Sequence, residues 1–325
     1  MAKLTVIQAI NSALMQEMER DENVLIMGED VGVDGGVFRA TEGIYAKFGA
    51  KRAIDSPLAE AGIVGTAIGM AIKGLRPVTE IQFSGFIYPA FQELVSHAGR
   101  IRNRSRGRYH CPLVVRAPYG GGFKALEHHS ESTEAYFIHT PGLKVVMPST
   151  PYDAKGLLVS AIRDNDPVIF FEPLRIYRAF KEEVPDELYT VPIGEAKIEK
   201  EGNDVTVISY GTWMHSTRQA VEELTQQGLS IELIDLRTVS PLDEDTIIKS
   251  VQKTGRCVIV HEAQKTCGLG AEISATIMEK CLFNIKGPVV RVTPPDVIPP
   301  LAKLEPYYQT STARIQKGIK KAMEF

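Results

Sequence analysis

Short apolar runs alternate with longer helical patterns along the first half of the chain. The runs are rich in β-branched residues and apolar on both faces, which predicts buried strands rather than half-exposed ones. Helical stretches separate them, and this rhythm is typical of repeated βαβ units in a parallel sheet with helices on either side. The predicted strands cover residues 24–28, 77–83, 112–118, 143–149 and 167–173.

A second series of the same kind begins after residue 200. Between the two series, residues 186–200 carry mixed charge and no sustained period, as expected of a connecting segment. The sequence therefore predicts two doubly wound α/β domains at 1–185 and 201–325, joined by a linker at 186–200. The predicted strands of the second domain are 205–211, 230–238, 257–264 and 288–295, with helices at 214–228, 243–255 and 271–280.

Composition and charge argue against several classes of function. A net charge of −3 gives no broad electrostatic reason to bind nucleic acid or a membrane surface. The four cysteines form no CxxC pair, so neither a zinc site nor a disulfide framework is indicated. The longest apolar run, 61–72, is shorter than the roughly 20 residues that a membrane span needs. We expect a cytoplasmic protein; a mitochondrial matrix location would require that a transit peptide had been removed.

One acid stands in an otherwise apolar helix. The segment 55–74, DSPLAEAGIVGTAIGMAIKG, predicts a helix that starts at Pro57 behind a capping Ser56, with Glu60 in the first turn. Glu60 either complements the positive end of the helix or is a buried carboxylate that exchanges a proton with a ligand nitrogen. The pattern does not choose between these, but it predicts substantial burial. A stripe of small residues also follows the helix: Gly62, Gly65 and Gly69.

The segment 119–132, YGGGFKALEHHSES, follows a predicted strand. Its three consecutive glycines permit either a mobile loop or a tightly turned one. Adjacent histidines rarely reach one metal ion, and no other ligand lies at a suitable spacing, so a metal site at His128 and His129 is not favoured. A single imidazole that donates a proton is one interpretation, because histidine titrates near neutral pH. Two solvated loop histidines are the other.

An arginine-rich stretch, GRIRNRSRGR at 99–108, has cations at alternate positions. On a strand these would form a phosphate-binding ladder, but no aromatic residues interleave as single-stranded nucleic acids require. We expect the stretch to continue the preceding helix and its arginines to face solvent or another subunit. No GxGxxG or GxxxxGK[ST] motif is present, and the lone GxG at 267–272 is a weak signal for a diphosphate site.

Six blocks of the chain carry a resemblance to a known family, and they lie at 28–43, 55–83, 129–132, 141–158, 164–173 and 233–243. Together they resemble the beta subunits of the thiamine-diphosphate-dependent first component of 2-oxo acid dehydrogenase complexes, essentially from end to end. The resemblance implies oxidative decarboxylation of a 2-oxo acid with transfer of the acyl group to lipoamide. The motifs FSGF and GRYHCP are more similar to the pyruvate members. Branched-chain 2-oxo acids such as 2-oxoisovalerate are the alternative, and a non-catalytic scaffold subunit is a further one.

The resemblance assigns roles to individual residues. The acid of the PLAE block, Glu60, exchanges a proton with the aminopyrimidine ring of thiamine diphosphate and favours its imino tautomer. Leu58 contacts the same ring, and Phe86 stacks on it. Of the two histidines, the family's HS pattern falls on His129, which positions or protonates the acyl intermediate during transfer.

Partners are implied as well. Related enzymes hold the diphosphate and Mg²⁺ with a GDG motif, which is absent from this chain, so the resemblance implies an alpha subunit that supplies it in an α2β2 tetramer. A transketolase-like single-chain transferase is disfavoured for the same reason. The second domain resembles the transketolase C-terminal domain, which docks the subunit-binding domain of a lipoyl acyltransferase; Glu324 and Phe325 are candidate contacts.

Four positions match a structural potassium site of some relatives: Leu113, Ala161, Asp164 and Asp166. The segment RDNDP within this set fits equally well as a turn before a strand. The chain also departs from its relatives at Asn103 and Arg106, where many have tyrosine and glycine, and in reading HSES at 129–132. These changes leave Glu60 and His129 intact but alter the expected shape of the site entrance.

Overall fold

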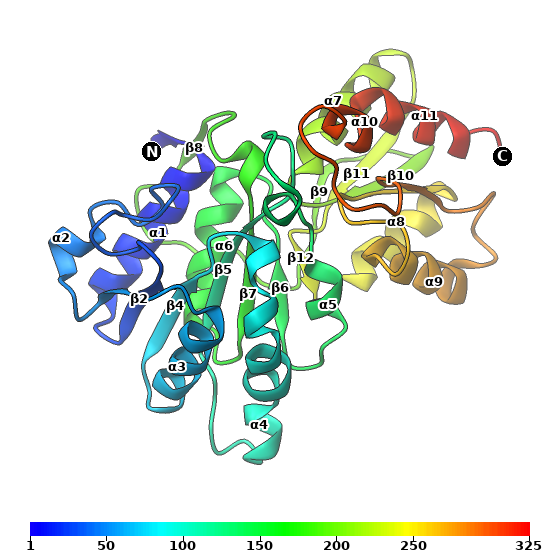
Figure 1. Ribbon diagram of the computed structural model, residues 1–325. Helices are drawn as coiled ribbons and strands as arrows, with labels where there is room; N and C mark the ends of the chain where they lie inside the picture. Colours follow the sequence, from blue (N-terminus) through cyan, green and yellow to red (C-terminus); the bar gives the residue numbers. More distant parts are fainter.

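The computed structural model describes all residues, 1–325. Its N-terminal domain is built on a seven-stranded sheet with the order β12-β6-β7-β5-β4-β2-β3, parallel except for the antiparallel edge strand β12 (Figure 1). Strands β2, β5 and β7 are buried along their whole length, as their unbroken apolar runs predicted. The strands are β2 (Val24–Gly28), β3 (Ala53–Asp55), β4 (Arg76–Glu80), β5 (Val114–Tyr119), β6 (Lys144–Val146), β7 (Val168–Pro173) and β12 (Thr238–Ser240).

Helices cover both faces of this sheet. On one face α1 (Val6–Arg20) packs against α6 (Pro151–Arg163), and their apolar sides share one core with the strands. The other face carries α3 (Glu60–Ile72), α5 (Glu134–Ile138) and an irregular helical run that ends in α4 (Ile101–Arg104). The small elements are α2 (Ile44–Phe48) and the ribbon of β1 (Ala2–Leu4) with β8 (Glu182–Val184).

The C-terminal domain has a five-stranded sheet with the order β14-β13-β10-β11-β9, in which only β9 is antiparallel. Helices α7 and α11 pack on one face, while α8 and α9 lie on the other. The strands are β9 (Lys197–Lys200), β10 (Val205–Ser209), β11 (Ile231–Asp235), β13 (Cys257–Val260) and β14 (Val290–Val292). The helices are α7 (Trp213–Gln226), α8 (Glu244–Thr254), α9 (Leu269–Cys281), α10 (Glu305–Tyr308) and α11 (Thr312–Ala322).

The α/β class and the doubly wound layers are as predicted, but the two domains are more closely joined than the pattern suggests. The predicted strand 230–238 divides, because Arg237 adopts a left-handed backbone (φ 56°) that ends the run. The chain then forms β12, which pairs with β6 of the other domain (Figure 1). Strand β9 lies inside the segment expected to connect the domains.

The start of α3 differs from the prediction. The helix begins at Glu60, three residues later than expected, and its N-cap Ala59 has no side-chain bond. The reason is that the preceding residues still belong to the sheet edge: Asp55 pairs in β3, and Ser56 N donates to the carbonyl of Gly28 at 2.9 Å. The expected cap by Ser56 is therefore wrong. None of the helices combines the length and apolar character that crossing a membrane requires.

Candidate functional site

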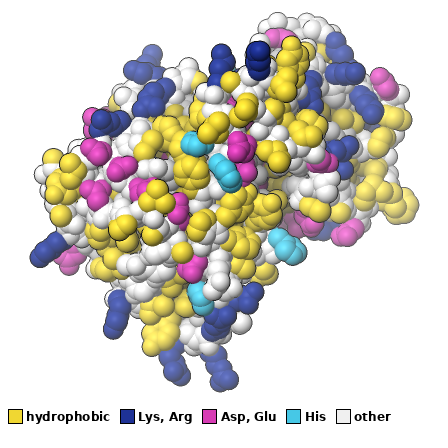
Figure 2. All heavy atoms as spheres, in the orientation of Figure 1, with side chains coloured by type: hydrophobic (Ala, Val, Ile, Leu, Met, Phe, Trp, Pro, Cys, Tyr) yellow, Lys and Arg dark blue, Asp and Glu magenta, His cyan; other side chains and the backbone are white.

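The loops that follow the parallel strands gather at the carboxyl edge of the N-terminal sheet, where ligands bind in folds of this type. The turn after β4 carries Phe86, the loop after β5 carries His129, and α3, which follows β3, begins at Glu60. Figure 2 shows histidine and acidic side chains together near the middle of this face, between the two domains. The edge is thus chemically distinct from the apolar surface around it.

Glu60 is only partly buried, so the prediction of a well-shielded acid is wrong for this chain. Its helix packs on the core through one face, formed by Ile63, Val64 and Ala67. Glu60 lies on the same face, at the first and less buried position of the helix. A second carboxylate stands close by. Burial raises the pKa of Glu29, and the charge of Glu60 raises it further.

The glycine stripe of α3 faces outward. Gly62, Gly65 and Gly69 are exposed, and a Cβ placed at Gly69 would meet no atom within 4 Å. At Gly65 the nearest atom would be Glu93 Cγ at 3.8 Å, which is ordinary contact. Packing within the domain therefore does not require glycine here. The stripe leaves an outward helix face that another backbone could approach closely.

His129 is enclosed by aromatic rings. Its imidazole packs edge-on against Phe83, with ring centroids 4.4 Å apart, and against Phe86 at 5.1 Å. Gly85 makes this approach possible, because a Cβ there would lie 2.1 Å from the carbonyl oxygen of His128. The structure thus brings together Phe86 and His129, two of the predicted site residues. The Nδ1 atom of His129 is buried without a hydrogen-bond partner, whereas His128 is exposed.

Leu58, the remaining residue predicted to bind the cofactor, lies on the surface just before α3. Its side chain is 76% exposed. It lies in the segment between β3 and α3, and its side chain faces solvent rather than the core. An exposed leucine at a sheet edge is apolar surface that is available for a ligand or another chain.

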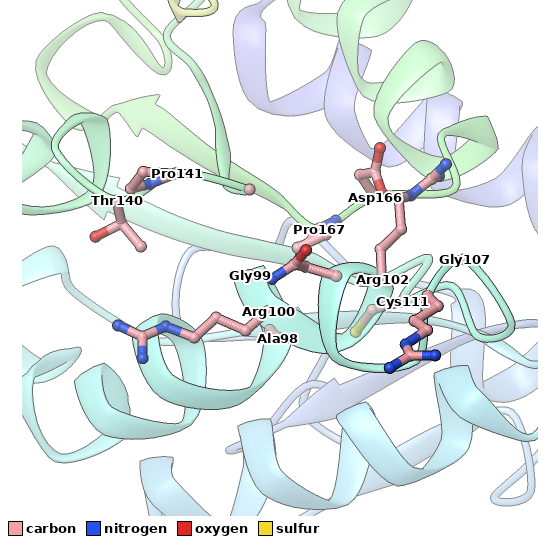
Figure 3. A pocket seen from close by; sticks show the side chains of 13 residues that line it. Ala98, Gly99, Arg100, Arg102, Gly107, Cys111, Thr140, Pro141, Asp166 and Pro167 are labelled. Atoms are coloured by element: carbon pink, nitrogen blue, oxygen red, sulfur yellow. Dashed lines mark hydrogen bonds and ion pairs between the residues drawn. The ribbon is translucent and has the colours of Figure 1, made fainter.

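The four residues proposed for potassium are engaged by other groups of this chain. Asp164 pairs with Lys144 Nζ at 2.5 Å, and Asp166 pairs with Arg102 Nε at 2.6 Å (Figure 3). The carbonyls of Leu113 and Ala161 accept backbone hydrogen bonds from Val168 at 2.9 Å and Asp164 at 3.2 Å. No group of three or more potential metal-ligating side chains occurs elsewhere. In this structure the two aspartate side chains therefore bind an ammonium and a guanidinium group, and the potassium site stays a prediction.

The arginine-rich stretch is helical, as expected, and lines a polar cavity of about 840 Å³ (Figure 3). Arg100 and Arg102 come from successive helical turns, while Arg106 has a left-handed backbone (φ 54°) at the position where relatives were expected to have glycine. The cations therefore spread around the run instead of forming a ladder along a strand. They are partly or fully solvent-exposed.

Beneath the site, a charged network is fully buried in the sheet. Arg116 of β5 binds Glu172 Oε1 at 2.6 Å and Glu80 Oε2 at 2.7 Å, and Tyr177 donates its hydroxyl proton to Glu172. Burial raises the pKa of Glu80, and Arg116 opposes that shift. The network ties three neighbouring strands together just below the loops that carry the site residues.

Sequence reasoning missed two acids of the C-terminal domain that reach this edge, Glu262 and Glu305. Both accept hydrogen bonds from backbone amides of the loop after β5. Glu262 stands two residues beyond the end of β13, so the rule that chemistry follows the carboxyl ends of parallel strands could have found it. Glu305 lies in a short helix without a comparable signal.

Comparison with known proteins agrees with the two-domain fold described above. Residues 2–179 match the family described as the transketolase pyrimidine-binding domain, and residues 194–315 match the transketolase C-terminal domain. A pyruvate dehydrogenase E1 component subunit beta from Acholeplasma laidlawii is 52% identical, covering 99% of this chain and 98% of its own. The chain belongs to this family of beta subunits.

Other relatives extend the comparison. The pyruvate dehydrogenase E1 component subunit beta of Bacillus subtilis is 49% identical over the whole length of both chains. Among solved structures, an inactive beta4 tetramer of a split-gene transketolase superposes with a TM-score of 0.79 and covers 99% of each chain. At 20% identity that similarity shows the fold alone. The family and the transketolase-like fold predicted from the sequence are therefore confirmed.

Proposed function

We propose that this chain is the beta subunit of a thiamine-diphosphate-dependent enzyme that oxidatively decarboxylates pyruvate and transfers the acetyl group to lipoamide. The observation that supports this best is the contact of His129 with Phe83 and Phe86 at the sheet edge where α3 begins with Glu60. Pyruvate is the substrate in the names of the relatives described above, which are pyruvate dehydrogenase components.

The residues at the edge fit one half of the cofactor, its pyrimidine ring. Glu60 offers a carboxylate that can hold a proton at a ring nitrogen, and Leu58 and Phe86 offer apolar surface for the ring. When bound, thiamine diphosphate supplies the nucleophilic carbon and accepts the electron pair that decarboxylation releases. His129 then holds or donates a proton at an imidazole nitrogen during acyl transfer, and the rings of Phe83 and Phe86 orient its imidazole.

The diphosphate half must come from another chain. No glycine-rich phosphate-binding motif follows any strand, and the start of α3 is partly exposed in this chain. We infer that an alpha subunit covers this face in an α2β2 tetramer, contributes Mg²⁺ and the diphosphate site, and completes the shielding of Glu60. The C-terminal domain would dock the lipoyl acyltransferase through its subunit-binding domain.

Replacing Glu60 tests the proposal against a scaffold role. In the assembled alpha–beta enzyme, Glu60→Gln should lower cofactor-dependent decarboxylation of pyruvate by at least about a hundredfold, because proton transfer to the ring would lose its partner. Asp34→Asn, at an exposed acid of the loop after β2, is the matched control and should retain full turnover. Unchanged decarboxylation in the Glu60 variant would mean that the chain only anchors its partner.

Substrate choice is measured in the same assembly. Turnover of pyruvate should exceed turnover of 3-methyl-2-oxobutanoate at equal concentration, because the relatives are pyruvate enzymes. A preference for the branched substrate would mean that the enzyme acts on branched-chain 2-oxo acids. The proposed roles of Glu60 and His129 would be unaffected.

A further inference from the structure

The loop that follows β5 is held in place by an acid of the other domain. We call residues 120–124 the glycine loop. The amides of Gly122 and Lys124 donate to the two carboxylate oxygens of Glu305 at 2.6 and 2.9 Å. Glu305 is only 6% exposed, and it is the first residue of α10. A buried carboxylate that accepts two backbone N–H groups forms strong and directional bonds, so it fixes the course of the chain between them.

A second acid from the same domain binds the loop next to this point. The amide of Gly121 donates to Glu262 Oε1 at 2.8 Å. Glu262 is 5% exposed and stands two residues beyond the end of β13, so the loop after this strand directs a carboxylate toward the N-terminal domain. The buried Oε2 atom has no hydrogen-bond partner, which leaves the carboxylate committed to this one contact.

The consecutive glycines are explained by these close approaches. At Gly120, with φ +84°, a Cβ would lie 2.5 Å from Glu262 Oε2. At Gly122, with φ +99°, it would lie 2.6 Å from Arg175 Cδ. No other residue fits these positions without displacing the acid or the arginine. Of the two sequence interpretations, a mobile loop or a tightly turned one, the structure supports the tightly turned loop.

The held amides are connected to His129 through aromatic contacts. Phe123 stands between the two amides that the α10 carboxylate binds. Its ring stacks on Phe83, with centroids 6.3 Å apart and planes 15° from parallel. Phe83 in turn contacts the imidazole of His129 at 4.4 Å. A displacement of the glycine loop would therefore shift the rings that enclose His129.

We propose that Glu262 and Glu305 are positioning residues for the acyl-transfer step. They clamp the glycine loop from the C-terminal domain and thereby fix the imidazole of His129, so the second domain takes part in the active site as well as in assembly. This inference rests on the proposed role of His129. It needs no contact between either acid and the substrate.

The test uses the assembled alpha–beta enzyme with Glu305→Gln, in which one of the two amides faces an NH₂ group instead of an acceptor. Two readouts are measured: the rate of tryptic cleavage after Lys124, and acyl transfer to lipoamide compared with decarboxylation supported by an artificial electron acceptor. Cleavage should rise about tenfold because the loop opens locally. The kcat of acyl transfer should fall about tenfold while decarboxylation changes less than about twofold.

Additional variants make the result decisive. Glu279→Gln removes an exposed acid of the same domain and should change neither readout. Gly120→Ala changes the loop instead of the acids, and its added Cβ would collide with Glu262. It should therefore also give faster cleavage and slower acyl transfer. An unchanged cleavage rate in Glu305→Gln overturns the proposal, and so does faster cleavage with unchanged acyl transfer. His129→Ala should lower acyl transfer by about a hundredfold without faster cleavage. Unchanged acyl transfer in this variant would refute the proposed role of His129 alone.

Discussion

At the scale of single residues, surroundings separate two histidines that the sequence presents as equals. His129 is packed between Phe83 and Phe86 and has a buried nitrogen without a partner, while His128 is exposed. A buried, unpaired nitrogen is costly unless a ligand or a reacting group uses it. This contrast favours the choice of His129 that the HS pattern suggested.

Alanine substitution of each histidine checks that choice. His129→Ala should lower acyl transfer to lipoamide by about a hundredfold, since proton transfer by a positioned imidazole typically contributes that much. His128→Ala should change it less than about threefold, because an exposed side chain holds no fixed geometry. The kinetics of acyl transfer by the assembled enzyme give both values. Equal losses of transfer in the two variants would mean that His129 is the wrong choice.

The Arg116 network predicts a large effect on stability. Arg116→Leu would leave the carboxylates of Glu80 and Glu172 buried without their cation, and breaking such a pair typically costs about 3–5 kcal/mol. The midpoint of urea unfolding should fall accordingly. Arg108→Leu, at an exposed arginine, is the control and should leave the midpoint almost unchanged. Equal midpoints for the two variants would contradict the network's structural role.

At the scale of elements, α3 combines two faces with different tasks. One side buries Ile63, Val64 and Ala67 against the sheet, and the other presents glycines to solvent. Glycine is unfavourable in a helix interior, so an exposed glycine that packs against nothing weakens the isolated chain. Such a face is explained if it is covered by the backbone of a partner.

Gly69→Ala therefore has two opposite effects. The purified chain should become more stable by roughly 1 kcal/mol, because alanine has the higher helix propensity and its Cβ meets no atom within 4 Å. Its assembly with an alpha subunit should weaken, which analytical ultracentrifugation measures. The same change in α9, Gly270→Ala, should destabilise the chain, since the added Cβ would lie 2.7 Å from His261 Nε2. A gain in stability without weaker assembly would mean that the partner does not cover this face.

At the scale of the whole molecule, the two domains meet through ionisable groups as well as through β12. Asp235, at the end of β11, accepts a hydrogen bond from Ser149 of the N-terminal domain and lies 3.4 Å from Arg218. Burial raises the pKa of Asp235 to about 7, although Arg218 acts in the opposite direction. The contact between the domains therefore titrates near neutral pH.

This shift sets the sign of a pH effect. A carboxyl group whose pKa is higher in the folded chain contributes stability that is present at low pH and is lost as the pH rises from about 4 through 7. The melting temperature should thus fall between pH 5 and pH 8. Asp235→Asn, which cannot ionise, should reduce that fall, and calorimetry of both proteins at several pH values measures it. An identical pH dependence in the variant would show that another group controls it.

The sequence predicted much of this architecture because the strands are continuous apolar runs whose burial leaves few alternatives. It failed where a single backbone conformation decides the path. The left-handed Arg237 sends β12 into the other sheet, and the pairing of Ser56 with Gly28 delays the start of α3. Local patterns carry no information about either event, since both depend on neighbours distant in the chain.

The chain alone determined the family and the α/β class, and it predicts Glu60 and His129 as the acid and the histidine of the site, because these inferences depend on residue types at fixed spacing along one segment. Only the tertiary structure decided that Glu60 is partly exposed, that Asp164 and Asp166 bind Lys144 and Arg102, and that Glu305 accepts two amides of the glycine loop. Burial and pairing are properties of surfaces brought together from remote segments, so they arise only when the chain has folded.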